Sequence, residues 1–234
     1  MNIANRKALS LLHMSDLHIG TEAYDEAPFR GLESALAKAH EKQVDAILIA
    51  GDLFDNHRVS EETIDRVLNN LAAGGRPVIV LPGNHDAVLT QGLWSGETPR
   101  GVTIMKEPEG EMVMLEDLGL AVWGRPVYDH RPEFRPLEGM PPRPWSEWYV
   151  TMAHGLFMEV PEEPPRSSPI SPEEIGAAAC DYLALGHVHA FRDVSQNGVP
   201  AFYSGAPSAS WTKTVALVEL DPPTGVSVSQ LQLP

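Results

Sequence analysis

Five short polar blocks along this chain contain the residue types that bind metal ions. They supply carboxylate, amide and imidazole groups, and they contain no thiolate. Such oxygen and nitrogen donors suit Mn, Fe, Zn or Co in nearly octahedral sites and argue against a structural zinc knot. Two neighbouring metals are the usual device for in-line displacement at phosphorus, so the blocks predict a phosphoester-cleaving centre. The blocks are Asp16-Leu17-His18, Gly51-Asp52-Leu53-Phe54-Asp55, Gly83-Asn84-His85-Asp86, His154-Gly155 and Gly186-His187-Val188-His189.

These blocks follow short apolar runs, each bounded by Gly, Pro or a polar residue, which predicts buried strands. The candidate ligands would then leave the carboxyl ends of core strands, where open α/β sheets place their sites. If the backbone is extended, the i, i+2 pairs Asp16 and His18, and His187 and His189, each project to one side of the chain. The predicted strands are Leu9–Leu12, Ala46–Ala50, Val78–Leu81, Tyr149–Ala153 and Tyr182–Leu185.

The same five blocks, in the same order, resemble the signature of the calcineurin-like metallophosphoesterase superfamily, from Asp16 to about Trp211. The resemblance implies two divalent metal ions, with Mn favoured and Fe, Zn, Co or Mg as alternatives. It implies that His85 is the catalytic histidine and that Asp86 orients it. The implied metal ligands are Asp16, His18 and His189 for one metal, Asn84, His154 and His187 for the other, and Asp52 as the bridge.

The residues flanking the blocks look most like the nuclease branch, the Mre11/SbcD-type DNA-repair exonucleases. Those nucleases continue into a DNA-capping domain and an ATPase-binding tail, whereas this sequence stops at Pro234, so we expect neither here. Some family members carry His where Asp55 stands. A role of a second histidine in DNA cleavage is therefore not transferred to this chain. The flanking segments are His13–Gly20, Ala50–Asp55, Leu185–His189 and Tyr203–Pro207.

Composition and length are typical of a compact single-domain enzyme, and the resemblance implies that this is one metallophosphoesterase domain spanning residues 1–234. Hydrophobic residues make up 43%, and no apolar stretch approaches the ~20 residues of a membrane span, so we expect no membrane partner. A single cysteine, Cys180, cannot form an internal disulfide and favours a reducing, cytoplasmic location. We interpret it as a small buried apolar residue.

The charge balance opposes tight binding to duplex DNA. The chain carries 17 Lys and Arg against 32 Asp and Glu, a formal net charge of -15. Affinity for duplex DNA comes largely from neutralising phosphates with basic side chains. A nucleotide, a small diester or a single-stranded nucleic-acid end is therefore the expected phosphoester substrate.

Elsewhere the chain alternates between predicted strands and helices. Apolar spacing predicts a helix over 29–41, and a capping Ser with an acidic first turn predicts another from Ser60 to Gly74. Ser171 to Glu174 has the form of a capping box, and 215–233 alternates like a β-hairpin. The expected fold class is α/β, a four-layer αββα sandwich of two mixed β-sheets flanked by helices.

The segment 125–172 contains eleven of the 21 prolines, so long regular elements are not expected there except the strand reaching His154. Two interpretations stay open for its first half. The arginines and aromatics of 125–149 are either a substrate-binding loop or a proline-stiffened surface loop that packs on the core. The residues concerned are Arg125, Tyr128, His130, Arg131, Phe134, Arg135, Arg143, Trp145, Trp148 and Tyr149.

The expected function is hydrolysis of phosphodiester bonds, in which two metals activate water and His85 acts as the acid. A phosphomonoesterase or cyclic-nucleotide phosphodiesterase of the same fold is the alternative, and a non-catalytic scaffold is the remote one. We interpret His13, His40 and His57 as structural. Asp55 is either a turn cap or a support for the site, and we expect a turn at Tyr203 to Gly205.

Overall fold

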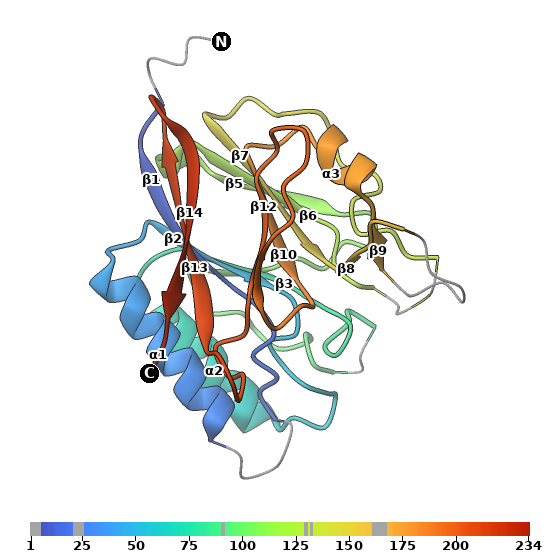
Figure 1. Cartoon of the computed structure of the whole chain (residues 1–234). Coiled ribbons are helices and arrows are strands. Elements are labelled where there is room, and N and C mark those ends of the chain that lie inside the picture. Colours follow the sequence, from blue (N-terminus) through green and yellow to red (C-terminus); the bar gives the residue numbers. More distant parts are fainter. Residues whose placement is uncertain (1–5, 21–25, 90–91, 129–130, 132, 161–167) are drawn as a thin grey trace.

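The computed structural model describes residues 6–20, 26–89, 92–128, 131, 133–160 and 168–234. Its main body is two six-stranded mixed sheets packed face to face (Figure 1). The first has the order β14-β13-β1-β2-β3-β4, and the second the order β11-β12-β10-β7-β6-β5. The expected two-sheet α/β sandwich is thus confirmed.

In the first sheet, β1 to β4 run parallel and the hairpin β13–β14 adds two antiparallel strands beyond β1. The central strands are buried on both faces, which explains their continuous apolar sequences. The strands are β1 Leu9–Met14, β2 Ala46–Ala50, β3 Val78–Leu81, β4 Val102–Ile104, β13 Thr214–Asp221 and β14 Gly225–Gln232.

Two long helices, α1 (Ala27–Glu41) and α2 (Glu61–Ala73), cover the outer face of this sheet (Figure 1). Both match the predicted helical segments. The Ser60 hydroxyl accepts a hydrogen bond from the Thr63 amide at 3.2 Å, so the expected cap of α2 is present. The apolar stripe of each helix packs on the sheet, and it includes Leu32 and Leu71, neither of which is exposed to solvent.

In the second sheet, β6, β7, β10 and β12 are parallel, while β5 and β11 are antiparallel edge strands. The strands are β5 Glu111–Leu115, β6 Leu120–Gly124, β7 Trp148–His154, β10 Tyr182–Gly186, β11 Phe191–Asp193 and β12 Ala201–Ser204. Short elements complete the described chain: the 3₁₀ helix η2 Glu116–Leu118, β8 Leu156–Phe157, β9 Pro169–Ile170 and α3 Pro172–Ala177. The predicted capping box of α3 is present, between Ser171 and Glu174.

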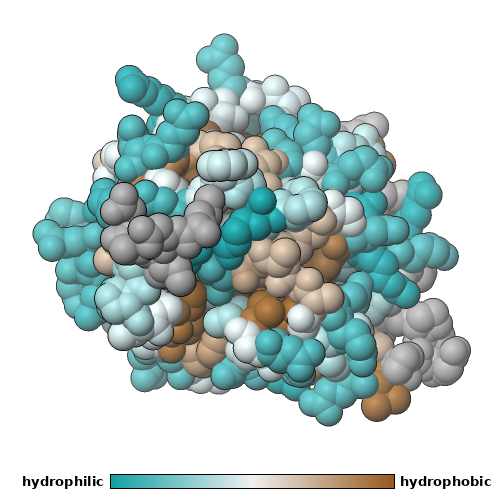
Figure 2. Space-filling view, turned by 90° about the horizontal axis from the view of Figure 1, so that it is seen from above, coloured by the Kyte–Doolittle hydropathy of each residue, from teal (hydrophilic) through white to brown (hydrophobic). Residues whose placement is uncertain are grey.

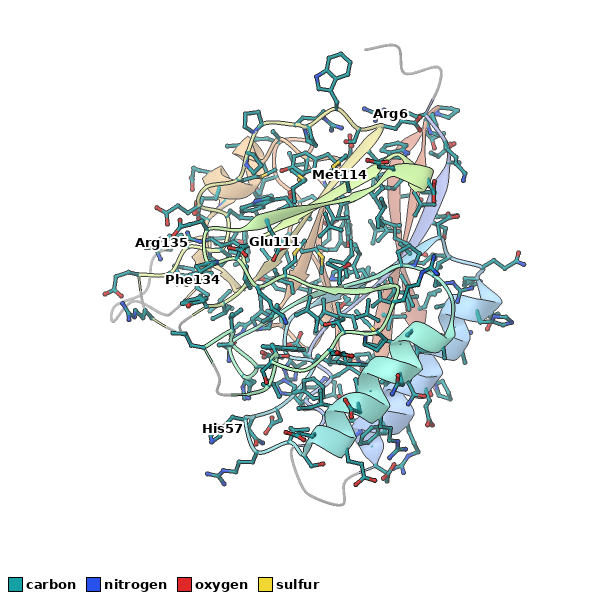
Figure 3. The ribbon with its side chains drawn as sticks, turned by 180° about the vertical axis from the view of Figure 1, so that it is seen from behind. Arg6, His57, Glu111, Met114, Phe134 and Arg135 are labelled. Atoms are coloured by element: carbon teal, nitrogen blue, oxygen red, sulfur yellow. The ribbon has the colours of Figure 1, made fainter. Side chains whose placement is uncertain are left out.

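The outer face of the second sheet carries less helix than the first. Among the described residues, α3 is the one α-helix on this side, and the proline-rich segment supplies much of the remaining cover. That segment contains only short elements besides β7, as predicted. Figure 3 shows Phe134 and Arg135 together on this side of the molecule. The fourth layer is therefore made mostly of loop.

The arginines and aromatics of this segment lie in more than one place. One set lines a single pocket and consists of Arg125, Tyr128, Arg131 and Phe134. Trp148 and Tyr149 are buried within β7, and Arg143 pairs with Asp181 at 2.7 Å. Asp181 also bonds Arg6, which lies at the opposite end of the molecule from His57 (Figure 3). Figure 2, which looks down on the end where β1 begins, shows apolar residues as patches among hydrophilic ones. His130 lies outside the described residues.

None of the helices in the described part of the chain is long and apolar enough to cross a membrane.

Candidate metal centre

The five polar blocks meet at the end of the sandwich where the parallel strands finish. β1, β2 and β3 deliver their blocks from one sheet, and β7 and β10 deliver theirs from the other. Gly186 at the end of β10 pairs with His154 at the end of β7, so the two blocks of the second sheet lie in register. The prediction that the candidate residues lie at the carboxyl ends of core strands is confirmed.

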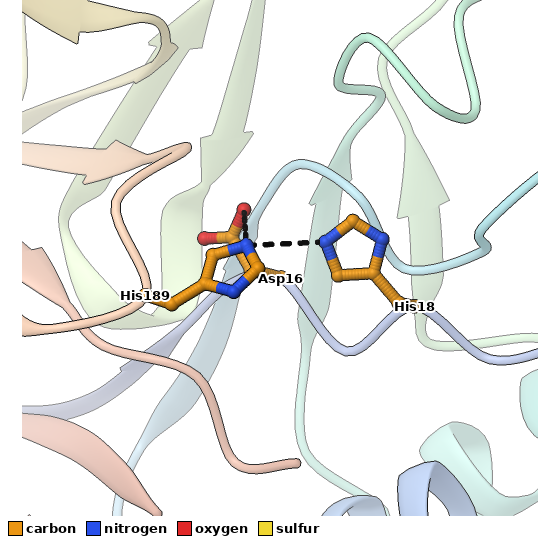
Figure 4. Close-up of side chains that lie close together, drawn as sticks. All are labelled: Asp16, His18 and His189. Atoms are coloured by element: carbon orange, nitrogen blue, oxygen red, sulfur yellow. Dashed lines mark hydrogen bonds and ion pairs between the residues drawn. The ribbon is translucent and has the colours of Figure 1, made fainter. Parts of the chain in front are cut away.

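One group of donors consists of Asp16, His18 and His189 (Figure 4). The His189 Nε2 atom lies 3.6 Å from the Asp16 Oδ1 atom and 3.3 Å from the His18 Nε2 atom. Asp16 is buried, whereas the side chain of His189 is 42% exposed. This group therefore opens toward solvent on the His189 side.

A second group surrounds the amide oxygen of Asn84. The Oδ1 atom of Asn84 lies 3.0 Å from His154 Nε2 and 3.1 Å from His187 Nδ1. The Asp52 carboxylate lies between the groups, with its Oδ2 atom 3.3 Å from His154 Nε2 and 3.8 Å from His18 Nε2. Its position is that of a group shared by two neighbouring ions.

The donor set fits divalent metal ions. A metal about 2.1 Å from two neighbouring octahedral ligands holds those ligands about 3 Å apart, close to the separations found here. The Nε2 atoms of His18 and His189 lie 3.3 Å apart, close enough for both to reach a common cation. Two sets of His and carboxylate side chains lie close enough together to hold an ion. One consists of Asp16, His18 and His189, and the other of Asp16, Asp52 and His154.

The electric field at the centre attracts cations. Burial alone would lower the pKa of His154, but the charge and hydrogen bond of Asp52, with a smaller contribution from Asp16, raise it to about 10. Burial likewise opposes the ionised form of Asp52, yet His154 holds the pKa of that carboxyl well below its ordinary value. The metal-free protein thus already stabilises positive charge beside Asp52.

The backbone at the centre differs from the extended geometry considered for the i, i+2 pairs. Asp16, His18 and Asp52 have φ values of 56°, 51° and 51°, and His187 has 103°. These left-handed conformations are unfavourable for side chains with a Cβ, by about 1–3 kcal/mol each. Backbone bonds from Asp16 to Gly51 and from His18 to Asp52, both 3.0 Å, hold the first two turns in place.

Glycine is required where the blocks press against one another. A Cβ on Gly51 would meet the His154 ring at 2.0 Å, and one on Gly83 would meet the Asp52 carboxylate at 2.2 Å. A Cβ on Gly186 would lie 1.7 Å from the Ala50 carbonyl oxygen. These glycines therefore permit the close backbone approach of the blocks.

His85 and Asp86 are arranged differently from the expected pair. The exposed His85 ring donates a hydrogen bond from Nδ1 to the Asp55 carbonyl oxygen at 2.9 Å, and the Asp55 carboxylate lies 3.5 Å away. In the described structure the Asp86 carboxylate contacts backbone amides rather than this ring. It accepts hydrogen bonds from Gly83, Leu53 and Phe54 at 2.7, 2.9 and 3.1 Å.

Asp55 therefore takes the place that we expected for Asp86. It also lies 3.0 Å from the His18 Nδ1 atom, which leaves the Nε2 atom of that ring facing the donor group. Of the two interpretations of Asp55, support of the site fits these contacts. The block Gly51 to Asp55 contained the signal, because its carboxylate is three residues after Asp52. Asp86 instead joins the second and third blocks.

Three further histidines and Tyr203 lie outside the two donor groups. His13 is fully buried, and its Nδ1 atom is 2.8 Å from the Tyr182 hydroxyl, while His40 and His57 are exposed, which fits structural roles. The predicted turn at Tyr203 is wrong, because Tyr203 and Ser204 lie in β12. The Tyr203 hydroxyl donates to the Gly155 carbonyl and accepts from the Phe157 amide, so its role is to fix the chain after His154.

The fold and the clustered oxygen and nitrogen donors are those of a metal-dependent hydrolase. The sequence model of the calcineurin-like phosphoesterase family matches residues 9–191, and the chain belongs to this family. The resemblance found in the five blocks is thereby confirmed, and members of this family depend on dinuclear metal centres.

Relatives include proteins of the Mre11/SbcD type. The chain is 38% identical over 89 residues to a subunit of the nuclease SbcCD of Escherichia coli, a match that covers 35% of this chain and 22% of that protein. It is 25% identical over 240 residues to the DNA double-strand break repair protein Mre11 of Methanopyrus kandleri, covering 85% and 49%. The chain thus spans half or less of the length of these two relatives.

A solved structure supports the fold. The crystal structure of TT1561 of Thermus thermophilus superposes with a TM-score of 0.62 at 12% identity, covering 95% of this chain and 99% of the other. This likeness concerns the fold alone.

Proposed function

We propose that this protein is a dinuclear metal-dependent phosphodiesterase. The observation that carries the proposal is the position of Asp52, whose Oδ2 atom lies 3.3 Å from His154 and 3.8 Å from His18. One carboxylate oxygen thus faces both donor groups. The proposed ligands are Asp16, His18 and His189 for one metal, Asn84, His154 and His187 for the other, with Asp52 as the bridge.

When bound, the two divalent ions would activate water for in-line attack and neutralise the non-bridging phosphate oxygens. We propose Mn, because the ligands are oxygen and nitrogen donors without thiolate. The protein itself contributes His85, which is exposed at the edge of the centre and to which we assign no metal. His85 would stabilise the transition state or protonate the leaving oxygen.

Asp55 and Asp86 have separate supporting roles in this proposal. Asp55 fixes the rings of His18 and His85 through its carboxylate and its carbonyl, so we assign to it the orienting role first expected of Asp86. Asp86 is buried, and its three backbone hydrogen bonds hold the loop of His85 against the loop of Asp52. A change at Asp86 would therefore act on both loops at once.

The substrate class that we propose is a small diester, a nucleotide or a single-stranded nucleic-acid end. The names of the Mre11 and SbcCD relatives point to DNA, but the net charge of -15 for these 234 residues opposes capture of a long polyanion. The chain's one cysteine also favours a cytoplasmic location.

A substrate panel with added Mn tests the proposal. Mononitrophenyl phosphate, bis-nitrophenyl phosphate, cyclic nucleotides and single-stranded DNA would be compared after exhaustive chelation and after return of the metal. We expect chelation to abolish turnover, Mn to restore it best, and the diesters to be hydrolysed faster than the monoester. Full turnover with no metal found by elemental analysis would overturn the metal centre. A preference for the monoester would identify a phosphomonoesterase instead.

Asp52→Asn is the matching variant, with the exposed His57→Gln as its control. Because Asp52 faces both donor groups, the loss of its charge should weaken the binding of both metals together. Titration of Mn into each variant would show this directly. Loss of only one metal would refute the bridging role.

A further inference from the structure

The strand β14 leaves one long edge of the first sheet without a neighbouring strand. It is the last strand of that sheet, and in the part of the chain that the structure describes it pairs with β13 alone (Figure 1). It has eight residues, of which none is charged and none is proline. Its register with β13 is continuous from Gly225 to Gln232, so no bulge turns the edge away from a possible partner.

The other edges of the two six-stranded sheets are protected in the ways that natural sheets use. The edge strands β4 and β11 have three residues each, and β11 carries Arg192 and Asp193. The edge strand β5 has five residues and begins with Glu111. Short strands and charged side chains discourage pairing with another chain, whereas a long uncharged edge is open to it. Among the described sheet edges, β14 is therefore the one that lacks such protection.

Two hydrogen bonds identify the backbone groups that face outward from this edge. The Leu233 amide donates to the Lys213 carbonyl at 2.8 Å, so the backbone groups of Leu233 point toward β13. The Thr214 amide, one residue further along β13, donates to Ala206 instead, as the alternation in an antiparallel pair requires. The same alternation along β14 leaves the N–H and C=O groups of four residues pointing away from β13. They are Val226, Val228, Gln230 and Gln232.

We propose that β14 is a dimerisation strand, which pairs antiparallel with β14 of a second copy of this chain. The strand is complementary to itself in a register centred on Ser229 of both copies. In that register Val226 lies opposite Gln232 of the partner subunit, and Val228 lies opposite Gln230 of the partner subunit. Every outward N–H and C=O group then has a partner across the interface. Because the contact uses the same edge of both copies, the assembly closes as a twofold dimer.

The distribution of charge favours a second copy of the chain at this edge. Two copies that each carry a formal net charge of -15 repel, so they approach best where neither presents a charged side chain, as along β14. The charges on the adjoining strand are complementary in the same register. Lys213, at the start of β13, lies at the same level across the strands as Asp221 of the partner subunit. Three strand spacings, about 14 Å, separate the two backbones, so this pair favours the register more than it adds affinity.

Cysteine cross-linking tests the register. The two copies of Ser229 would form a non-hydrogen-bonded pair with Cα atoms about 4.5 Å apart, a separation that a disulfide can span. Oxidised Ser229→Cys should therefore appear as a covalent dimer in non-reducing gel electrophoresis. Ser227→Cys is the matched control, because Ser227 is also exposed on the same face of β14 but would lie about 14 Å along the strand from its own copy. Both variants keep Cys180. Cross-linking of both variants alike, or of neither, would overturn the proposed pairing.

Sedimentation equilibrium of the full chain, from low to high micromolar protein, tests whether the dimer forms. The unmodified chain should show a reversible monomer–dimer equilibrium without larger species. Ser229→Lys places two like charges directly opposite each other and should weaken dimerisation at least about 5-fold, and Ser229→Asp should do the same. An equimolar mixture of the two variants should dimerise again, because Lys then faces Asp. A folding defect could not produce this rescue.

The result is independent of the metal centre, because β14 supplies none of the proposed metal ligands. A chain that stayed monomeric at every concentration would overturn the dimer. A dimer that was unchanged by Ser229→Lys would use another surface and would equally overturn the role of β14. In both cases the proposed function would be unaffected, since Mn binding and diester hydrolysis of the Ser229 variants should match those of the unmodified protein.

Discussion

Replacing Gly186 by alanine should destabilise the protein strongly, because this glycine is where the two sheets touch beside the centre. The added Cβ would lie 1.7 Å from the Ala50 carbonyl oxygen and 2.8 Å from His154 Nδ1. The shortest separation that a Cβ tolerates is about 3.0 Å, and the separation from the Ala50 oxygen would be 1.7 Å. The strands β10 and β2 would therefore have to move apart by the difference, about 1.3 Å. Both atoms belong to buried groups that cannot turn away.

The expected loss of stability depends on which atom the added Cβ would overlap. Overpacking against adaptable side chains costs about 1–3 kcal/mol, and here the obstacle is the backbone of a central strand, so we expect about 3 kcal/mol or more. For a chain of this length that corresponds to a fall in Tm of roughly 6–12 °C. The Ala50 carbonyl also accepts a hydrogen bond from His154 Nδ1 at 2.9 Å, so metal affinity should fall as well.

Urea unfolding in excess chelator is the appropriate assay, since it separates stability from metal binding. Gly96→Ala is the matched control, because a Cβ there meets nothing within 4 Å and its φ is not in the left-handed region. We expect the control to stay within about 0.5 kcal/mol of the unmodified protein. If Gly186→Ala unfolded at the same urea concentration as Gly96→Ala, the close contact between the sheets would be wrong.

Three further predictions concern acid stability, catalysis and substrate size. Burial lowers the pKa of His13 from 6.5 to about 3, so the unfolded chain binds this proton first. The contribution of neutral, buried His13 to the free energy of unfolding is complete above pH 6.5 and is lost as the pH falls toward 3. The loss is about 3 kcal/mol at pH 4.5. His13→Gln should flatten urea midpoints between pH 6.5 and 4.5, exposed His40→Gln should not, and equal slopes would contradict the assignment. His85→Ala should leave Mn binding intact yet slow unactivated diesters by roughly 10²–10⁴-fold, with a smaller loss for nitrophenyl esters, and His57→Ala is its control. Loss of metal in His85→Ala would contradict the division of roles. Finally, kcat/KM at fixed salt and Mn should fall from a small diester to a short single strand to a long blunt duplex, because the net charge is -15. Equal efficiency on duplex would point to a DNA-binding surface that the charge balance does not predict.

Local sequence was sufficient for much of the fold. The helices α1 and α2 follow from apolar spacing and, in α2, from the Ser60 cap, because both signals act within one or two turns. The five predicted strands are found because continuous apolar runs indicate burial on both faces. The short strands β4, β11 and β12 lack such runs, and pairing with neighbouring strands defines them, so they could not be predicted in this way.

The sequence by itself also determined which donors the centre contains, since their types and order are written in the five blocks. Only the tertiary structure decided how these donors face one another. The left-handed φ of Asp16 and His187 is maintained by contacts between distant segments, as in the bonds of the His187 amide to the Asp16 carboxylate at 3.0 and 3.2 Å. The contacts of the Asp55 carboxylate with histidine rings, and of the Asp86 carboxylate with backbone amides, have the same origin. Whether a carboxylate meets a ring or a backbone amide depends on how separate loops pack, and that packing is a property of the whole fold.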